Sequence, residues 1–176
     1  MKHLITLTLF CSALAAFAKD KPPLNLPYTA DGHIQYREVI EMPGVPAAEL
    51  MKRARLWLAK AYRSAPDVMK GNEEDQLVAK GLFQIHQGGM GAGVWTVRHI
   101  LSIESKDGRA RVTLDGFEVE WGERMRNATA LDSDGYQKGP NDPRFGFRSL
   151  FEGVDREARA LIASLQVALS KPAESW

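Results

Sequence analysis

The sequence predicts an α+β domain of two layers, in which an antiparallel sheet carries two helices on one face. Two segments, residues 45–64 and 149–169, repeat apolar residues at intervals of three and four, which is typical of helices with one buried face. The residues between them alternate between apolar and polar, as strands do. Two helices that each bury one stripe on the same sheet form a two-layer fold.

The first strand and the first helix come in direct succession. Apolar residues recur at a period of two through 33–42, which predicts a strand that Pro43-Gly44 ends. The predicted helix over 45–64 has Pro46, a residue suited to the first helical turn, near its start, and Pro66 ends it. Its apolar stripe consists of Leu50, Ala54, Trp57, Leu58 and Ala61.

The next segment predicts a short strand at 67–71, a turn at 72–75 and a longer strand at 77–86. Gly81 interrupts the apolar positions of the longer strand. A glycine inside a strand often marks a close approach of another group to the backbone. A glycine-rich loop over 87–93 follows.

Asp107-Gly108 predicts a two-residue hairpin turn between a strand at 94–104 and the strand that follows it. The register places Ile103 opposite Val112, Leu101 opposite Leu114, and Glu104 opposite Arg111. Apolar residues then meet on one face and opposite charges on the other. The apolar positions shift from even to odd after Asp115, which predicts a bulge at Gly116.

Residues 122–148 have no period and are rich in Gly, Asp, Asn and Pro, which indicates a long loop. Within it, residues 132–135 (Asp-Ser-Asp-Gly) predict a polar turn, because an incomplete set of ligands argues against a calcium loop. Ser149 and Glu152 have the spacing of a capping box, which predicts the start of the second helix. Lys171-Pro172 ends that helix.

The order of these elements resembles a known family. The resemblance rests on Tyr36-Arg37-Glu38-Val39, Pro43-Gly44, the stripe from Leu50 to Trp57, Lys80-Gly81 and Lys106-Asp107-Gly108-Arg109, and it covers roughly residues 33–121. The chain looks like the exported bacterial domain of unknown function with a TBP-like fold. The resemblance implies a β-α-β4-α core and an exported setting. It implies no activity, cofactor or catalytic residue, because fold does not imply function.

The N-terminus indicates export. Lys2, an apolar run and Ala16-Phe17-Ala18 form the pattern of a secretory signal peptide over 1–18, so we expect a periplasmic or secreted protein. Phe10 is too large to precede a lipidated Cys11, and cleavage after Ala18 removes this single cysteine. The prediction divides the remainder into a proline-rich linker at 19–32, a single domain at 33–170 and a tail at 171–176. No other apolar stretch is long enough to span a membrane.

Charge and composition exclude several classes of partner. The chain has 23 Lys and Arg against 22 Asp and Glu, and the signal removes Lys2. A neutral chain lacks the basic footprint that nucleic-acid binding requires. No histidine pair has the short spacing of a zinc motif, so we expect no metal and no cofactor.

The sheet face away from the helices is the predicted binding surface. Alternation places polar and basic side chains there, and we expect Lys80, His86, Arg98 and Arg111 to contact an envelope protein, a glycan or a lipid headgroup. The residues that share this face are Lys80, Gln84, His86, Thr96, Arg98, Ser102, Arg111 and Thr113. An ordinary solvated face, which antiparallel sheets commonly have, is the plainer alternative.

Two further functions stay open at this point. His86 borders the glycine-rich loop and would be the general base of a small exported hydrolase. Alternatively, the domain is a structural module whose helices or edge strand form a dimer. His99 shares the apolar face of its strand and is expected to be a hydrogen-bonded core residue.

Overall fold

In the computed structural model, the described residues are 22–62, 72–73, 75–87, 93–121, 128–133 and 147–172. The predicted signal peptide, the strand at 67–71 and most of the glycine-rich loop lie outside them. The elements within them are β1 (Tyr36–Glu41), α1 (Ala47–Ala61), β2 (Asn72–Glu73), β3 (Gln76–Gln87), β4 (Gly93–Lys106), β5 (Arg109–Trp121), β6 (Thr129–Ala130) and α2 (Phe147–Ser170). No helix among the described residues is long and apolar enough to cross a membrane.

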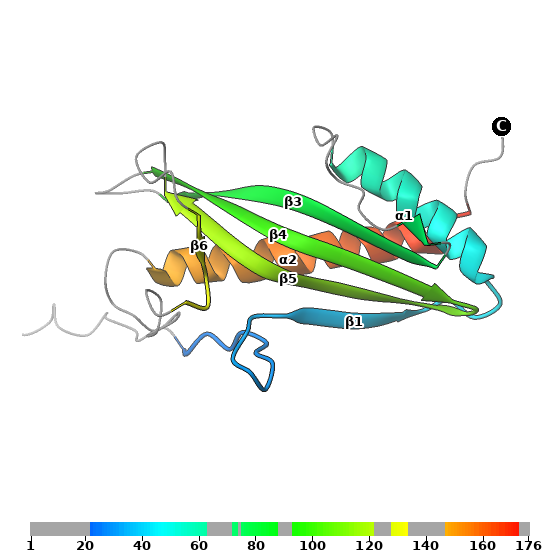
Figure 1. Cartoon of the computed structure of the whole chain (residues 1–176), viewed down its shortest axis with the longest axis horizontal. Helices are drawn as coiled ribbons and strands as arrows, with labels where there is room; N and C mark the ends of the chain where they lie inside the picture. Colours follow the sequence, from blue (N-terminus) through cyan, green and yellow to red (C-terminus); the bar gives the residue numbers. More distant parts are fainter. Residues whose placement is uncertain are drawn as a thin grey trace, which may run out of the picture.

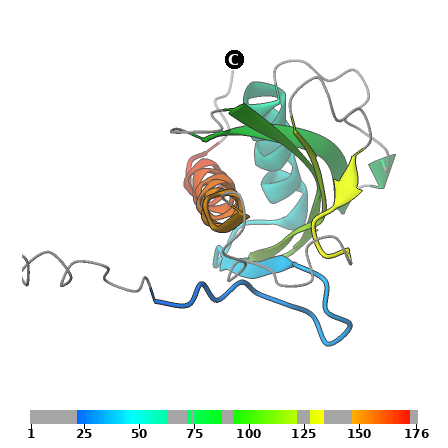
Figure 2. The same ribbon diagram turned by 90° about the vertical axis from the view of Figure 1, so that its left-hand side faces the viewer.

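The strands form one antiparallel sheet in the order β1-β5-β4-β3-β2, and β6 pairs with the end of β5 beyond β1. Figure 1 shows both helices on the same side of this sheet. In Figure 2 the sheet curves around the helices, so the uncovered face is convex. The predicted two-layer α+β class is therefore confirmed.

The helices bury most of the stripes that their sequences predict, but in α1 the predicted Ala61 is exposed and Met51 is buried instead. In α1 the buried residues are Leu50, Met51, Ala54, Trp57 and Leu58. Pro46 occupies the N-cap position, and the helix begins two residues later than predicted. In α2 the buried residues are Leu150, Phe151, Gly153, Val154, Ala158, Ile162, Leu165 and Leu169.

The start of α2 corrects two predictions. The helix begins at Phe147, so Ser149 lies within its first turn and the predicted capping box is wrong. Glu152 instead accepts a hydrogen bond from Arg148 Nε at 2.8 Å, one helical turn away. Within the predicted loop over 122–148, residues 129–130 form β6 and residues 147–148 belong to α2.

The β4–β5 hairpin has the predicted register. Ile103 lies opposite Val112, Leu101 opposite Leu114, and Glu104 opposite Arg111. The turn also contacts the connection between β1 and α1. The Gly108 carbonyl accepts from Met42 N–H at 2.7 Å, and Gly108 N–H donates to the Val45 carbonyl at 2.9 Å. Asp107 Oδ1 accepts from the first amide of α1, Ala47 N–H, at 2.8 Å.

The predicted bulge lies at Gly116. Arg98 pairs with Glu118 and Ile100 with Asp115, so two residues of β5 lie opposite His99 of β4. Gly116 has a φ of 59°, a conformation that glycine adopts without strain. The bulge brings Phe117 and Val119 back to the buried face.

Gly81 marks the close approach that its position in a strand predicts. It pairs with His99 across β3 and β4, and a Cβ at Gly81 would overlap the ring of Tyr62 and lie 2.7 Å from His99 Nε2. Tyr62 Oη and His99 Nε2 are hydrogen-bonded at 2.8 Å. The missing side chain therefore makes room for the tyrosine ring that closes α1 onto the sheet.

Two short segments differ from the sequence prediction. Asn72–Glu73 forms β2 and pairs with the start of β3, so the first half of the turn predicted at 72–75 is a strand, while Asp75 lies in the turn. Part of the predicted linker at 19–32 contacts the domain. Leu26 is buried, Tyr28 bridges to Ile34, and the Pro22 carbonyl accepts a hydrogen bond from Arg148.

Replacing Gly81 with alanine is expected to lower the free energy of unfolding by about 1–3 kcal/mol, because the new methyl group overpacks the Tyr62–His99 contact. The measurement is urea unfolding of Gly81→Ala, Tyr62→Ala and the double variant. Removing the ring should make the glycine substitution much less costly. Equal losses in both backgrounds would contradict this role of Gly81.

Candidate functional site

The convex sheet face carries the four residues that the sequence singled out. Lys80, His86, Arg98 and Arg111 are all exposed there, as alternation predicts. The strands spread them over the face. Arg98 and Glu104, the partner of Arg111, lie six residues apart on β4, which corresponds to roughly 20 Å of strand. His86 pairs with Val94 of β4, which lies on the other side of Arg98 from Glu104. The four residues therefore form no single cluster.

The face is not as basic as the sequence suggested. Arg98 forms an ion pair with Glu120, and Arg111 forms one with Glu104. Beyond the Gly116 bulge, Glu118 lies directly opposite Arg98. The carboxylates neutralise much of the positive charge that the arginines contribute, and the environment of Arg98 does not favour an anionic ligand.

A hollow of about 210 Å³ lies on this face, next to the Asp107-Gly108 turn. We call it the hairpin-end hollow; it is lined by Val39, Glu104, Lys106, Arg109 and Arg111. The side chains of Lys106 and Arg109 are exposed and lie opposite each other in the hairpin. Three cations and one carboxylate thus surround an apolar residue, Val39, whose side chain is 53% exposed.

Within the described part of the chain, neither Lys106 nor Arg109 forms an ion pair with a carboxylate. Arg111 uses one guanidinium nitrogen for Glu104, and a guanidinium has five N–H donors in total. The hollow can therefore donate several hydrogen bonds to one carboxylate or phosphate group.

Sequence reasoning identified Arg111 and missed Lys106 and Arg109. Both residues flank the hairpin turn, and the predicted register already placed them opposite each other on the face of Arg111. Extending the alternation by one pair would have identified the cluster.

Among the described residues, His86 has no partner of the kind that general-base catalysis would require. Its side chain is exposed, and no hydrogen bond to it is present among the described residues. The histidine with an oriented carboxylate is His33. Its Nδ1 lies 2.6 Å from Oδ2 of Asp132, a residue 99 positions away in the turn after β6.

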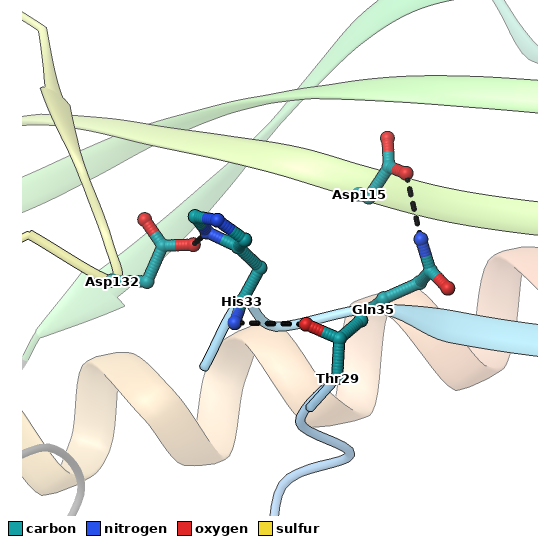
Figure 3. Close-up of polar contacts among 5 residues, drawn as sticks. All are labelled: Thr29, His33, Gln35, Asp115 and Asp132. Atoms are coloured by element: carbon teal, nitrogen blue, oxygen red, sulfur yellow. Dashed lines mark hydrogen bonds and ion pairs between the residues drawn. The ribbon is translucent and has the colours of Figure 1, made fainter. Parts of the chain in front are cut away.

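Figure 3 shows how this pair is held. The main-chain N–H of His33 donates to Thr29 Oγ1 at 3.1 Å. Two residues later, the side-chain amide of Gln35 donates to Asp115 Oδ2 at 3.1 Å. The hydrogen bond that Asp132 accepts from the ring and its negative charge raise the pKa of His33 above its ordinary value of 6.5. The pair joins the N-terminal segment to the β5–β6 edge of the sheet.

His99 is a core residue, as predicted. It is 3% exposed, stacks on Phe83 and contacts the ring of Tyr62. Desolvation lowers the pKa of His99 to about 4, so the imidazole is neutral at neutral pH. Its Nδ1 has no hydrogen-bond partner among the described residues.

The described residues contain no group of three or more His, Cys, Asp or Glu side chains placed to hold a metal ion. His33 and Asp132 together supply two side chains of these types, and the lining of the hairpin-end hollow supplies one, Glu104. The chemistry that these residues offer is binding of an anionic group and proton exchange at an exposed imidazole.

A family model matches residues 36–120; it describes a domain of unknown function (DUF4468) with TBP-like fold. No curated protein sequence matches the chain. The matched residues run from the start of β1 to the end of β5 and include the hairpin, the bulge and α1.

Two crystal structures have the same fold. A TBP-like protein from Parabacteroides distasonis superposes with a TM-score of 0.68 at 10% identity, covering 84% of this chain and 99% of its own. A DUF4468 family protein from Bacteroides ovatus gives a TM-score of 0.64 at 14% identity, covering 86% and 94%. Sequence identities this low establish the shared fold alone.

The pKa of His33 provides a test of its pairing. Protonated His33 attracts Asp132, so the pair stabilises the fold below pH 6.5 and loses this effect as the pH rises through the raised pKa. A histidine NMR titration should place the pKa of His33 above 6.5, and Asp132→Asn should return it close to 6.5. Asp31→Asn is the matched control and should have a smaller effect, because Asp31 acts only through its charge. A pKa that Asp132→Asn leaves unchanged would contradict the pairing.

Proposed function

Since residues 36–120 are a DUF4468 domain with a TBP-like fold, a description that assigns no activity, we propose from the geometry that the protein is an exported binding module. Its convex sheet face takes an anionic group of an envelope component at the hairpin-end hollow. The single observation that carries the proposal is the cluster of Lys106, Arg109 and Arg111 around the exposed Val39.

The chemistry of the hollow supports a carboxylate or phosphate ligand. Two of its cations have no carboxylate partner among the described residues, and the third, Arg111, keeps further donors. An arginine guanidinium matches the planar geometry of a carboxylate or phosphate. The exposed part of Val39 would contact the apolar part of the same ligand.

The shape of the face favours a displayed group over an enclosed small molecule. The sheet is convex, as Figure 2 shows, and the hollow is smaller than the usual range of roughly 300–1,000 Å³ for small-molecule pockets. A headgroup on a membrane, an acidic residue of a glycan or a protein side chain projects from a larger surface and reaches such a hollow. The signal peptide that the sequence predicts would bring the domain to the compartment where these components occur.

The hydrolase alternative receives no support from the described geometry. His86 lies outside the hollow, and no carboxylate orients its ring among the described residues. Lys80 and Arg98 also lie outside the hollow, and Arg98 is paired with Glu120. The proposed contact residues are therefore Lys106, Arg109 and Arg111.

Binding assays with three probes test this proposal: vesicles of phosphatidylglycerol and phosphatidylcholine, vesicles of phosphatidylcholine alone, and a uronic-acid polysaccharide. We expect one of the two anionic probes to bind, and Lys106→Ala and Arg109→Ala each to weaken that binding by about tenfold through loss of a hydrogen bond to a charged group. The matched controls are Arg98→Ala, on the same face but ion-paired, and Lys52→Ala, on α1.

Both controls should bind as the unmodified protein does. Equal weakening by Arg98→Ala or Lys52→Ala would show that binding follows net charge and would contradict a role for the hollow. Binding of the chosen probe that survives the double variant Lys106→Ala/Arg109→Ala would overturn the proposal.

A further inference from the structure

β1 lies at one edge of the sheet, among the described strands. It pairs on one side with β5, and no described strand pairs with its other side. Figure 1 shows β1 along the lower rim of the sheet, with the segment before it confined to its beginning. An unpaired edge presents a row of N–H and C=O groups that can pair with another strand.

The hydrogen bonds at both ends of β1 show which residues present these groups. Met42 N–H points toward β5, where it donates to the Gly108 carbonyl, whereas Gln35 N–H points the other way and donates to the Pro27 carbonyl. Because the direction alternates along a strand, the even-numbered residues bond to β5. The main-chain N–H and C=O groups of Arg37, Val39 and Glu41 therefore point away from β5. Among the described residues, these groups form no main-chain hydrogen bond.

The side chains of the same three residues lie on the convex face. Arg37, Val39 and Glu41 are all exposed, and Val39 is 53% exposed in the middle of the strand. Within the described chain, neither Arg37 nor Glu41 forms an ion pair. The edge thus carries a positive charge at one end, an apolar residue at its centre and a negative charge at the other end.

We propose that a second copy of this chain pairs with β1 in antiparallel orientation, with the two-fold axis at Val39. Val39 then lies opposite Val39 of the second copy, and Arg37 lies opposite its Glu41 at both ends. All three positions present outward main-chain groups, so each becomes a hydrogen-bonded pair of the new ladder. The two sheets join into one continuous sheet across the axis.

Charge complementarity selects this register. A shift that centres the axis on Arg37 places two arginines opposite each other, and one that centres it on Glu41 places two glutamates opposite each other. Intermediate shifts pair a charge with Val39. Opposite charges across a ladder stabilise it and like charges destabilise it, so only the register centred on Val39 satisfies both ends.

The dimer does not depend on the proposed binding function, although it would affect that function. Val39 belongs to the hairpin-end hollow, so the two-fold axis would place two hollows next to each other on the same convex face. A repeating anionic surface would then meet two contact points in place of one.

Reversal of the charges tests the pairing. The dimer dissociation constant is measured by sedimentation equilibrium of the purified full chain over a range of concentrations. Arg37→Glu alone and Glu41→Arg alone each place like charges opposite each other at both ends and should raise the dissociation constant at least about tenfold. The double variant Arg37→Glu/Glu41→Arg should restore it. A monomer at all concentrations, or single variants that dimerise like the unmodified chain, would overturn the proposal.

A proline at the centre of the strand tests the main-chain ladder separately. Val39 N–H points outward, so Val39→Pro removes no hydrogen bond of the monomer but blocks the ladder at the axis. We expect Val39→Pro to be monomeric while its circular dichroism stays that of the folded chain, and Val39→Thr, the matched control, to dimerise. Dimerisation of folded Val39→Pro would overturn the edge pairing.

The variants Lys106→Ala and Arg109→Ala leave β1 unchanged, so they should dimerise normally. Failure of the binding proposal is therefore distinguishable from failure of the dimer.

Discussion

The contact between the Asp107-Gly108 turn and the β1–α1 connection is the constraint on which the remaining structure depends. Gly108 accepts a hydrogen bond from Met42 and donates one to Val45, and Asp107 accepts one from the first amide of α1. These bonds satisfy main-chain groups that a strand end and a helix start otherwise leave unpaired. They also place β1 against β5 and set the point at which α1 turns onto the sheet.

This constraint connects the fold to the proposed surface. With α1 and α2 burying their stripes on the concave face, the convex face of the hairpin stays open to solvent. The same turn brings Lys106 and Arg109 next to the exposed Val39 of β1. The hairpin-end hollow and the free edge of β1 therefore adjoin each other, and a ligand and a second copy of the chain would meet neighbouring parts of one surface.

Local patterns were sufficient to predict the helices, the hairpin register and the bulge at Gly116, because each follows from the spacing of nearby residues. Contacts between distant segments were not predictable in this way. Nothing in the sequence near Asp107 points to Ala47, and His33 meets Asp132 across 99 residues. The charge of the binding face was only partly predicted. The bulge turns Glu118 and Glu120 toward Arg98, and alternation counted from the residues before the bulge does not place these carboxylates on this face.

Amide hydrogen exchange of Asp107→Ala, followed residue by residue by NMR, tests this central role of the turn most directly. We expect a loss of about 1 kcal/mol in stability, with protection lost first at Ala47, Met42 and Gly108, whose amides form the contact or adjoin it. Protection at the centre of α2, far from the turn, should fall only with global stability. Unchanged protection at Ala47 and Met42 in a folded Asp107→Ala protein would contradict the account.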